Sequence, residues 1–294
     1  MALPVQCRNE ARIGYGPMMQ NPARKIAFIL ASTDHGTLIV NRFDRHDVSE
    51  SMSFGVGFQL LEKTSYDDSE VALLLKLLDV RREHYGDGVI ALDCGANIGV
   101  HAVEWAKHMT GWGAVLAFEA QERLYYALAG NVAINNCFNA RAIHAAVGNQ
   151  PGMMKIPRPN YLAPASFGSL ELKKRDNTEF IGQSIDYSEH SMVAVPAMTL
   201  DSFSFPRLDL IKIDVEGMEL DVLAGASRCI ETHRPILFVE RLKTDERELR
   251  AVLERFGYAA FDFGMNLLAL HRADKSLSNL QQHQPAAAQV AAAE

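Results

Sequence analysis

From residue 89 onward, apolar runs of strand length alternate with segments that have the period of an amphipathic helix. Such alternation predicts parallel strands joined by crossover helices, which is an α/β fold. Seven runs are candidate strands: "VIALDC", "AVLAFE", "ARAIHAAVG", "LDLIKID", "PILFVE", "YAAFDF" and "NLLALHR". Open α/β sheets bind ligands at the carboxyl ends of their strands, so the residues that close these runs are the first candidates for a functional site.

The segments around this core carry weaker signals. Residues 1–65 contain the β-like runs "KIAFIL" and "TLIVNRF" without a sustained helical period, which predicts an N-terminal extension or small cap. "DDSEVALLLKLLDVRREHYG" predicts a helix with Asp68 or Ser69 as its N-cap and Gly86 as its end. We expect the main domain to cover residues 66–273.

Two further stretches lack a regular period. Residues 152–195 are rich in Pro, Asn and Ser, and a loop of that length predicts a role in substrate recognition. Tyr161 and Phe167 within it could form a stacking surface. Residues 274–294 are rich in Gln and Ala and are expected to form a disordered tail.

Composition excludes several classes of partner. The net charge is -7 with 22% charged residues, so an electrostatic binder of DNA or RNA is disfavoured. The four cysteines are scattered without a C-x-x-C pair, which indicates neither a structural zinc site nor a disulfide framework. No signal peptide or membrane-spanning run is evident, and we expect a soluble, cytoplasmic protein without a membrane partner.

The stretch "VIALDCGANIGVHAVEWA" places Asp93 at the end of a strand, Gly95 and Gly99 around a turn, and a helix after it. Glycines there let a backbone approach a nucleotide closely. The spacing is D-x-G-x-x-x-G, and Asn97 stands where the dinucleotide fingerprint G-x-G-x-x-G has its second glycine. An acid at this position would repel a pyrophosphate but could hold an ammonium group, which favours S-adenosylmethionine over NAD. Asn97 either binds the ligand or stabilises the turn.

The next strand run, "AVLAFE", ends at Glu119. A carboxylate has two acceptor oxygens and can therefore accept both hydroxyls of a ribose. Gly95 and Gly99 alone would indicate no more than a tight turn. Asp93 and Glu119 at the ends of consecutive strands add two acids with distinct roles, and the combination predicts a nucleoside-type ligand.

A third acidic group follows the strand run in "LIKIDVEGMELDVLAGA", residues 210–226. Asp214 ends that run and Glu216 lies in the same loop, so both are candidates to line an active site and remove a proton from an acceptor. The alternative for each is an acid that complements a helix dipole, which is the role expected of Glu219 and Asp221. Lys212 interrupts the apolar run and is expected to pair with a buried acid.

Other side chains remain open candidates. Glu240 closes "ILFVE" and either reaches the acceptor pocket or is a solvated strand end. His101, His144 and His190 are isolated, and a lone histidine is usually structural. Asp93, Asp214 and Glu216 together offer oxygen ligands to magnesium, but without histidines or a clear third ligand no metal is expected.

Five stretches of this sequence resemble the FkbM family of S-adenosylmethionine-dependent methyltransferases over roughly residues 66–272: "LDCGANIGVHA", "AFEAQERLYYALAGNVAINN", "AAVG", "MTLDSF" and "LDLIKIDVEGMELDVLAGA". The resemblance implies a Rossmann-like, seven-stranded class I methyltransferase sheet, mostly parallel with an antiparallel last strand and helices on both faces. It also implies methylation of a hydroxyl on a small-molecule or carbohydrate acceptor, such as a sugar, a glycan or a polyketide-like secondary metabolite. The donor-binding positions that carry over are Asp93, Gly95, Asn97, Gly99 and Glu119.

One departure from the family pattern follows the ribose-binding acid. The family usually has Pro after this Glu, whereas Ala120 and Gln121 follow Glu119 here, which could alter the turn near the adenine. Two alternatives to an active methyltransferase are a nicotinamide-dependent oxidoreductase and an inactive binding module with the same fold. The missing G-x-G-x-x-G argues against the oxidoreductase.

Overall fold

A seven-stranded sheet forms the centre of the computed structural model, which describes residues 24–49, 52–275 and 277. Its strand order is β13-β14-β12-β11-β5-β6-β7. The strands are β5 (Val89–Cys94), β6 (Gly113–Glu119), β7 (Ala140–His144), β11 (Leu210–Ile213), β12 (Ile236–Glu240), β13 (Tyr258–Phe263) and β14 (Asn266–His271). All seven strands predicted from the sequence pattern are therefore confirmed.

The sheet is parallel except at β14. β11 runs parallel to β5 and β12, and β5, β6 and β7 run parallel to one another. β14 pairs antiparallel with both of its neighbours, β12 and β13, as the family resemblance implies. The carboxyl ends of β5, β6, β11 and β12 consequently meet at one edge of the sheet.

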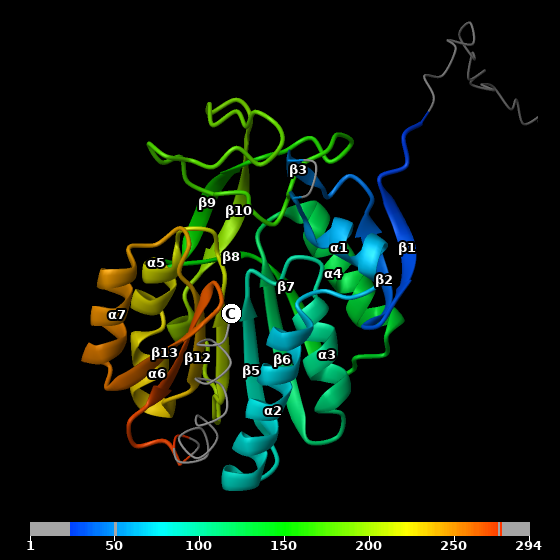
Figure 1. Cartoon of the computed structure of the whole chain (residues 1–294). Helices are drawn as coiled ribbons and strands as arrows, with labels where there is room; N and C mark the ends of the chain where they lie inside the picture. The colour runs from blue at the N-terminus through cyan, green and yellow to red at the C-terminus, as the bar shows by residue number, and fades with distance from the viewer. Residues whose placement is uncertain (1–23, 50–51, 276, 278–294) are drawn as a thin grey trace, which may run out of the picture.

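Helices cover both faces of the sheet (Figure 1). One face carries α2 (Asp68–Tyr85), α3 (Val100–His108) and α4 (Glu122–Ile134), and the other carries α5 (Glu219–Ala224), α6 (Ser227–His233) and α7 (Glu246–Arg255). Side chains alternate between the two cores: Ala91 and Leu210 pack toward α2 and α3, whereas Leu92 and Ile211 pack toward α5 and α6. Strands buried on both faces explain why these runs are almost entirely apolar.

Most predicted helices appear within a few residues of their expected ends. α2 begins one residue earlier than expected, with Asp67 as its N-cap, and ends at Gly86. α7 has a true side-chain cap, because Asp245 accepts the backbone N–H groups of Arg247 and Glu248. α6 was not predicted, since its seven residues are too short to show a helical period.

The N-terminal segment forms two hairpins and a helix. β1 (Phe28–Thr33) and β2 (Gly36–Asn41) match the predicted β-like runs, while β3 (His46–Ser49), β4 (Met52–Phe54) and α1 (Val56–Lys63) were not anticipated. Leu38 and Val40 are buried against α4. The fully buried Asn131 of α4 accepts the N–H of Ile39 at 2.5 Å and donates to its carbonyl at 3.3 Å, which fixes the hairpin to the core.

The prediction of a loop over residues 152–195 is wrong at both ends of this range, where the structure has strands. β9 (Gly152–Pro157) and β10 (Met192–Met198) pair antiparallel, and with β8 (Ala146–Val147) they form a three-stranded sheet of order β8-β10-β9. Ile156 and Val195 are buried on one side of this strand pair. The Pro, Asn and Ser content of the segment, from which the loop was predicted, gives no sign of these two buried strands. A short 3₁₀ helix, η1 (Leu200–Ser202), then leads to β11.

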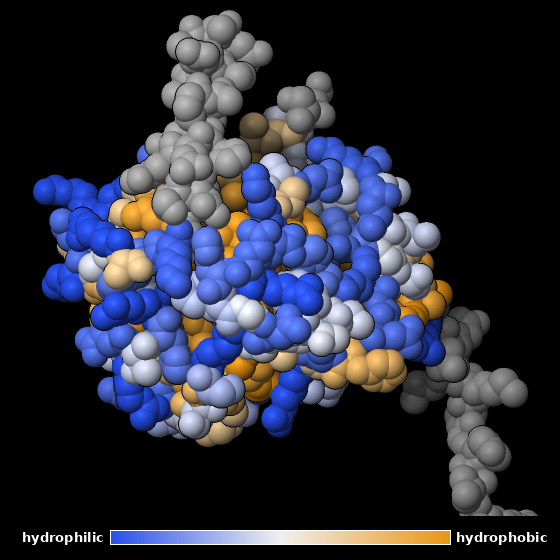
Figure 2. Space-filling view, turned by 90° about the horizontal axis from the view of Figure 1, so that it is seen from below, coloured by the Kyte–Doolittle hydropathy of each residue, from blue (hydrophilic) through white to orange (hydrophobic). Residues whose placement is uncertain are grey.

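The predicted tail of residues 274–294 lies almost entirely outside the described residues, as do the first 23 residues of the predicted extension. Within the ranges that the structure describes, no helix is both long and apolar enough to cross a membrane. Figure 2 looks onto the end of the molecule opposite the carboxyl edge of the sheet. This face is mostly hydrophilic, with hydrophobic residues in separate groups.

Candidate active site

A cavity of about 390 Å³ opens at the carboxyl edge of the sheet. Its lining joins the turn after β5, the ends of β6 and β12, and the loop after β11, as the strand order predicts. The N-terminal segment supplies a further wall. The polar and glycine residues of the lining are Gly55, Gln59, Tyr66, Asp67, Glu70, Gly95, Asn97, Gly99, His101, Glu119, Gln121, Ser166, Gly168, Ser169, Glu179, Lys212, Asp214, Glu216, Glu240, Lys243 and Asn266.

The glycines of the turn after β5 are required by the protein itself. A Cβ on Gly95 would lie 1.7 Å from the carbonyl oxygen of Asp214, and a Cβ on Gly99 would lie 2.4 Å from the side chain of Leu128. Both residues also have positive φ angles, 84° and 89°. These glycines let the turn pack against β11 and α4, and they also line the cavity, so their close approach to a ligand stays a prediction.

Asn97 stabilises this turn in a left-handed conformation, with φ 51°. Its side-chain oxygen accepts the backbone N–H of Ile98 at 2.8 Å, an arrangement that short polar side chains favour. Its own backbone N–H donates to Glu119 Oε2 at 2.9 Å. Of the two roles left open for Asn97, the turn-stabilising one is present, and the residue also lines the cavity.

Glu119 closes β6 and is 5% exposed. Its oxygens accept two backbone N–H groups, from Asn97 and, at 2.7 Å, from Gln121. Burial raises the pKa of Glu119 to about 7, although these two hydrogen bonds oppose the shift. A carboxylate has about four lone-pair sites, so two further donors, such as the hydroxyls of a ribose, can be accepted.

The residues after Glu119 connect it to the middle loop. Gln121 donates from its side-chain nitrogen to the carbonyl of Phe167 at 2.8 Å and accepts the hydroxyl of Tyr161 at 2.9 Å. Tyr161 and Phe167 therefore do not form the predicted stacking surface: Phe167 is fully buried in the core, and Tyr161 packs on it. The small residues Ser166, Gly168 and Ser169 line the cavity instead.

Asp93 and Asp214 share the lysine that interrupts β11. Lys212 lies opposite Asp93 in the strand register, and its ammonium is 2.8 Å from Asp214 Oδ2, so the expected pairing of Lys212 with an acid is confirmed. Burial alone would lower the pKa of Lys212, but Asp214, Asp93 and Glu70 raise it above its ordinary value. The ammonium consequently stays charged and compensates the acids around it.

Asp93 is 1% exposed, and neither of its oxygens has a hydrogen-bond partner among the described residues. Burial raises its pKa, against the opposing charges of Lys212 and His101. Asp93 lies next to the cavity rather than in its lining. His101, by contrast, lines the cavity and faces Glu70 at 3.1 Å.

Glu216 follows Asp214 in a left-handed conformation, with φ 56°. Its Oε2 forms an ion pair with Lys243, a buried lysine that also donates to the carbonyl of Ser169 at 2.8 Å. Burial raises the pKa of Glu216, and the nearby charge of Asp214 raises it further. The structure therefore brings Asp214 and Glu216 into one cavity and gives each a lysine partner.

Glu219 does not have the role expected of it. It is fully buried, and one oxygen accepts the N–H groups of Val215 and Gly217 at 3.1 Å each while the other accepts the hydroxyl of Thr244. Glu219 thus holds the turn that carries Glu216 rather than complementing a helix dipole in solvent. Asp221 fits the expectation better, since it is partly exposed and pairs with Lys173 at 2.5 Å.

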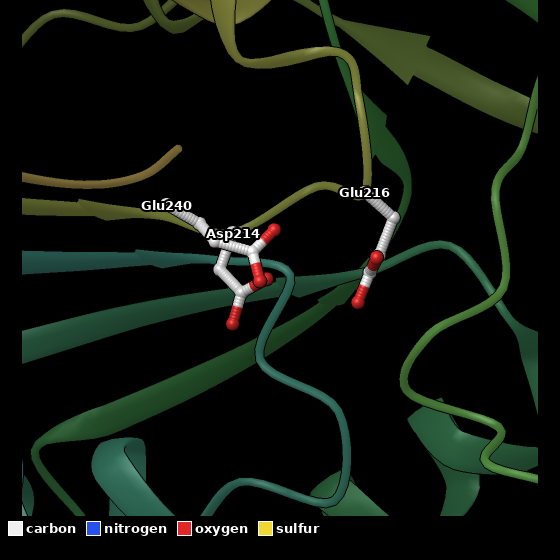
Figure 3. Close-up of side chains that lie close together, drawn as sticks. All are labelled: Asp214, Glu216 and Glu240. Carbon is white, nitrogen blue, oxygen red and sulfur yellow. The ribbon is translucent and has the colours of Figure 1, made fainter. Parts of the chain in front are cut away.

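Glu240, which ends β12, reaches the same place. Carboxylate oxygens of Asp214, Glu216 and Glu240 all lie within 4.8 Å of one another (Figure 3). The oxygen ligands considered from the sequence were Asp93, Asp214 and Glu216; in the structure Glu240 takes the place of Asp93 in this group. Lys212 and Lys243 already pair with two of the three acids, so the group carries no strong demand for a metal ion.

The residues present fit S-adenosylmethionine. The cavity has the size of a small-molecule site, Glu119 lines it with acceptor capacity to spare, and the carboxyl oxygens of Asp93 beside it have no hydrogen-bond partner among the described residues. The sulfonium of this donor would supply an activated methyl group. A parallel sheet with one antiparallel strand, and a nucleoside-sized site joined to acidic groups at its carboxyl edge, together define a methyltransferase-type domain.

Comparison with known proteins shows to which family this methyltransferase-type domain belongs. The model of the methyltransferase FkbM domain matches residues 93–260, which is more than half of the chain. The chain therefore belongs to the FkbM family of S-adenosylmethionine-dependent methyltransferases. The matched range contains all seven residues predicted from the sequence for the donor site and for catalysis.

Individual relatives are distant. The chain is 25% identical to "Methyltransferase 1" of Beauveria bassiana over 154 residues, which cover 48% of this chain and 59% of that protein. A crystal structure of methyltransferase FkbM from Methylobacillus flagellatus matches with 18% identity and a TM-score of 0.43, covering 63% of this chain and 43% of that one. A Pyrococcus abyssi tRNA (uracil-54, C5)-methyltransferase, solved with S-adenosyl-L-homocysteine, matches with 13% identity and a TM-score of 0.39, covering 83% of this chain and 44% of that one.

Proposed function

We propose that the protein transfers the methyl group of S-adenosylmethionine to a hydroxyl of a small-molecule or carbohydrate acceptor. The acceptor classes are those that the family resemblance implies: a sugar, a glycan or a polyketide-like secondary metabolite. The observation that carries the proposal is that two sets of side chains line the same cavity, one suited to the donor and one to the acceptor. Glu119 and the turn of Asn97 lie on one side, and Asp214, Glu216 and Glu240 lie on the other.

The chain's own residues account for the two requirements of such a transfer. Positioning an acceptor hydroxyl in line with the methyl group supplies most of the rate enhancement, and a cavity lined by polar groups from several strand ends suits that task. A hydroxyl must also lose its proton, and a carboxylate at a strand end is suited to accept it. Asp214 and Glu216 remain the candidates that the sequence pattern gives for this step.

Residues outside the family-matched range support a specific role in acceptor choice. Phe54, Val56 and Gln59 from the N-terminal segment and Met265 from the turn after β13 all line the cavity. The exposed apolar side chains of Phe54 and Met265 line the same cavity as the acidic groups. An acceptor with a polar reacting end and an apolar remainder matches this lining.

The experiment begins with donor binding. Calorimetric titration of the intact protein with S-adenosyl-L-homocysteine should show binding that Glu119→Ala weakens severely, because the ribose hydroxyls lose their acceptor. Glu122→Ala is the matched control, since Glu122 lies on the outer surface of α4. If the intact protein fails to bind this ligand, the proposal is wrong.

Methyl transfer itself is then measured by mass spectrometry of small-molecule extracts incubated with the protein and isotopically labelled S-adenosylmethionine. A labelled ether product supports hydroxyl methylation, whereas a labelled amine would redirect the proposal to N-methylation. Donor binding without any labelled product from a broad panel of extracts would favour the remaining alternative, an inactive binding module. NAD titration serves as the control for the oxidoreductase alternative, and no binding is expected.

A further inference from the structure

Glu240 differs from the other two carboxylates of the acidic group in its partners. Asp214 is held by Lys212 and Glu216 by Lys243. Glu240 Oε2 is buried and has no hydrogen-bond partner within the part of the chain that the structure describes. A carboxylate that accepts an acceptor's proton needs a free lone pair. Among these three acids, Glu240 is the one for which the described residues supply no lysine partner, and its buried Oε2 is unused.

From these contacts, and on the basis of the proposed function, we infer that Glu240 is the group that accepts the acceptor's proton. Its backbone lies at the end of β12, opposite Asn266 of β14, and both residues line the cavity. The carboxyl group therefore reaches the cavity from a central strand, where open α/β sheets place their ligands. Asp214 and Glu216 then act beside Glu240 as acids that are each paired with a lysine.

The charges around Glu240 explain how its proton is controlled. Asp214, Glu216 and Glu219 face it with negative charge, Lys243 faces it with positive charge, and Asn266 across the strand pair is neutral. Burial raises the pKa of Glu240 far above its ordinary value, and Asp214 and Glu216 raise it further. Glu240 consequently keeps its proton at neutral pH while the cavity contains no additional cation.

A positive charge in the cavity reverses this state. S-adenosylmethionine carries a sulfonium, and a cation near Glu240 stabilises the ionised carboxylate and lowers its pKa. Glu240 then loses its proton when the donor binds and becomes able to accept another. As the new oxygen–carbon bond forms and the sulfur–carbon bond breaks, with its electron pair left on sulfur, the hydroxyl proton passes to Glu240 Oε2.

The cycle closes without any further reactant. The products are a methyl ether, the neutral thioether S-adenosyl-L-homocysteine and protonated Glu240. Since the sulfonium charge has disappeared, Glu240 again holds its proton as it does in the free protein. The next donor molecule expels that proton to solvent.

Proton counting tests this inference without an acceptor. Calorimetric titrations in phosphate and in Tris at pH 8 give the number of protons released on binding, because the two buffers differ in ionisation enthalpy. S-adenosylmethionine and S-adenosyl-L-homocysteine share their amino acid group, so the difference between them reports the sulfonium charge. The wild type is expected to release up to one more proton with S-adenosylmethionine, and Glu240→Gln is expected to lose this difference.

Controls separate the possible failures. Glu254→Gln removes an acid from the exposed side of α7 and should behave as the wild type. Equal proton release by wild type and Glu240→Gln, with donor binding intact, would overturn the inference while leaving the proposed function in place. If neither ligand binds, the proposed function itself fails. Proton release on addition of magnesium chloride alone, lost in Glu240→Gln, would also overturn the inference, because Glu240 would then be a metal ligand.

Discussion

Gly95 and the carbonyl oxygen of Asp214 are in such close contact that any Cβ at position 95 would lie 1.7 Å from that oxygen. The turn after β5 and the acid that ends β11 are therefore one packed unit. The backbone N–H of Asp214 donates to the carbonyl of Cys94 at 3.0 Å, which adds a second connection. A change on the donor side of the cavity must consequently move the acceptor side as well.

Gly95→Ala should destabilise the fold and weaken donor binding together. Gly111→Ala is a matched control, because Gly111 has the same φ of 84° but no atom within 4 Å of the added Cβ. Gly111→Ala should lower the free energy of unfolding by about 1–2 kcal/mol, because alanine disfavours the left-handed conformation. Gly95→Ala should lower the free energy of unfolding by about 1–3 kcal/mol more than the control does, because the added Cβ overpacks the contact with Asp214. Urea denaturation of both variants measures this difference. Equal losses in the two variants would contradict the contact.

Lys212→Met should destabilise the folded protein strongly at pH 8. It leaves the buried acid Asp93 and the partly exposed Asp214 without their shared cation, and loss of the partner of a buried charge costs about 3–5 kcal/mol. Burial already raises the pKa of Asp93 against the opposing charge of Lys212, and loss of that cation raises it further, so protonation of Asp93 relieves the repulsion and the deficit should shrink at pH 5. Lys173→Met removes an exposed pair with Asp221 and should cost at most about 1 kcal/mol. A deficit independent of pH would argue that packing, rather than charge, explains the effect.

Donor affinity should fall as the pH drops below that at which Glu119 ionises. Burial raises the pKa of Glu119 to about 7, and the ionised form is the better acceptor for ribose hydroxyls. If only that form binds, affinity decreases by about tenfold for each pH unit below the pKa. S-adenosyl-L-homocysteine titrations at pH 6, 7 and 8 should show this loss in the wild type but not in Glu119→Gln. An identical pH dependence in both proteins would assign it to another group.

Kinetics with an identified acceptor should distinguish Glu240 from the base candidates given by the sequence. Glu240→Gln should lose about 10²- to 10⁴-fold in kcat with donor affinity retained, as expected for a proton acceptor. Asp214→Asn removes a charge that repels ionised Glu240, so its loss should be smaller and its acid limb should move to lower pH. A larger loss in Asp214→Asn, with no shift of the pH profile, would return the role of base to Asp214.

Asp209→Asn should affect stability without affecting donor binding. Asp209 is fully buried at the opposite end of β11, where it accepts Arg81 Nε at 3.0 Å and Arg207 Nη2 at 2.7 Å. Breaking this buried pairing should cost about 3–5 kcal/mol. Folded Asp209→Asn protein should bind S-adenosyl-L-homocysteine like the wild type, and a clear loss of affinity would show that the two edges of the sheet are coupled.

Local sequence patterns predicted the central sheet because its strands are buried on both faces and read as continuous apolar runs. The pair of Lys212 and Asp214 was also predictable, since residues two apart in a strand lie on the same face. Glu219 was misjudged because an acid at a helix start gives no sign of whether it faces solvent or a buried turn. The contact of Gly95 with Asp214 joins residues 119 positions apart, and only the assembled sheet brings them together.

Phe54 and Gln59 line the cavity from a segment that lies outside the family-matched range. On the proposed function, the residues that bind the donor and this N-terminal wall of the acceptor site are separate stretches of sequence. Mutations in the N-terminal hairpins can alter which molecules fit without disturbing Glu119 or the turn of Gly95. Such a division lets related enzymes diverge in substrate while inheriting one methyl-transfer machinery, and it makes residues 24–65 the place to begin when redesigning acceptor preference.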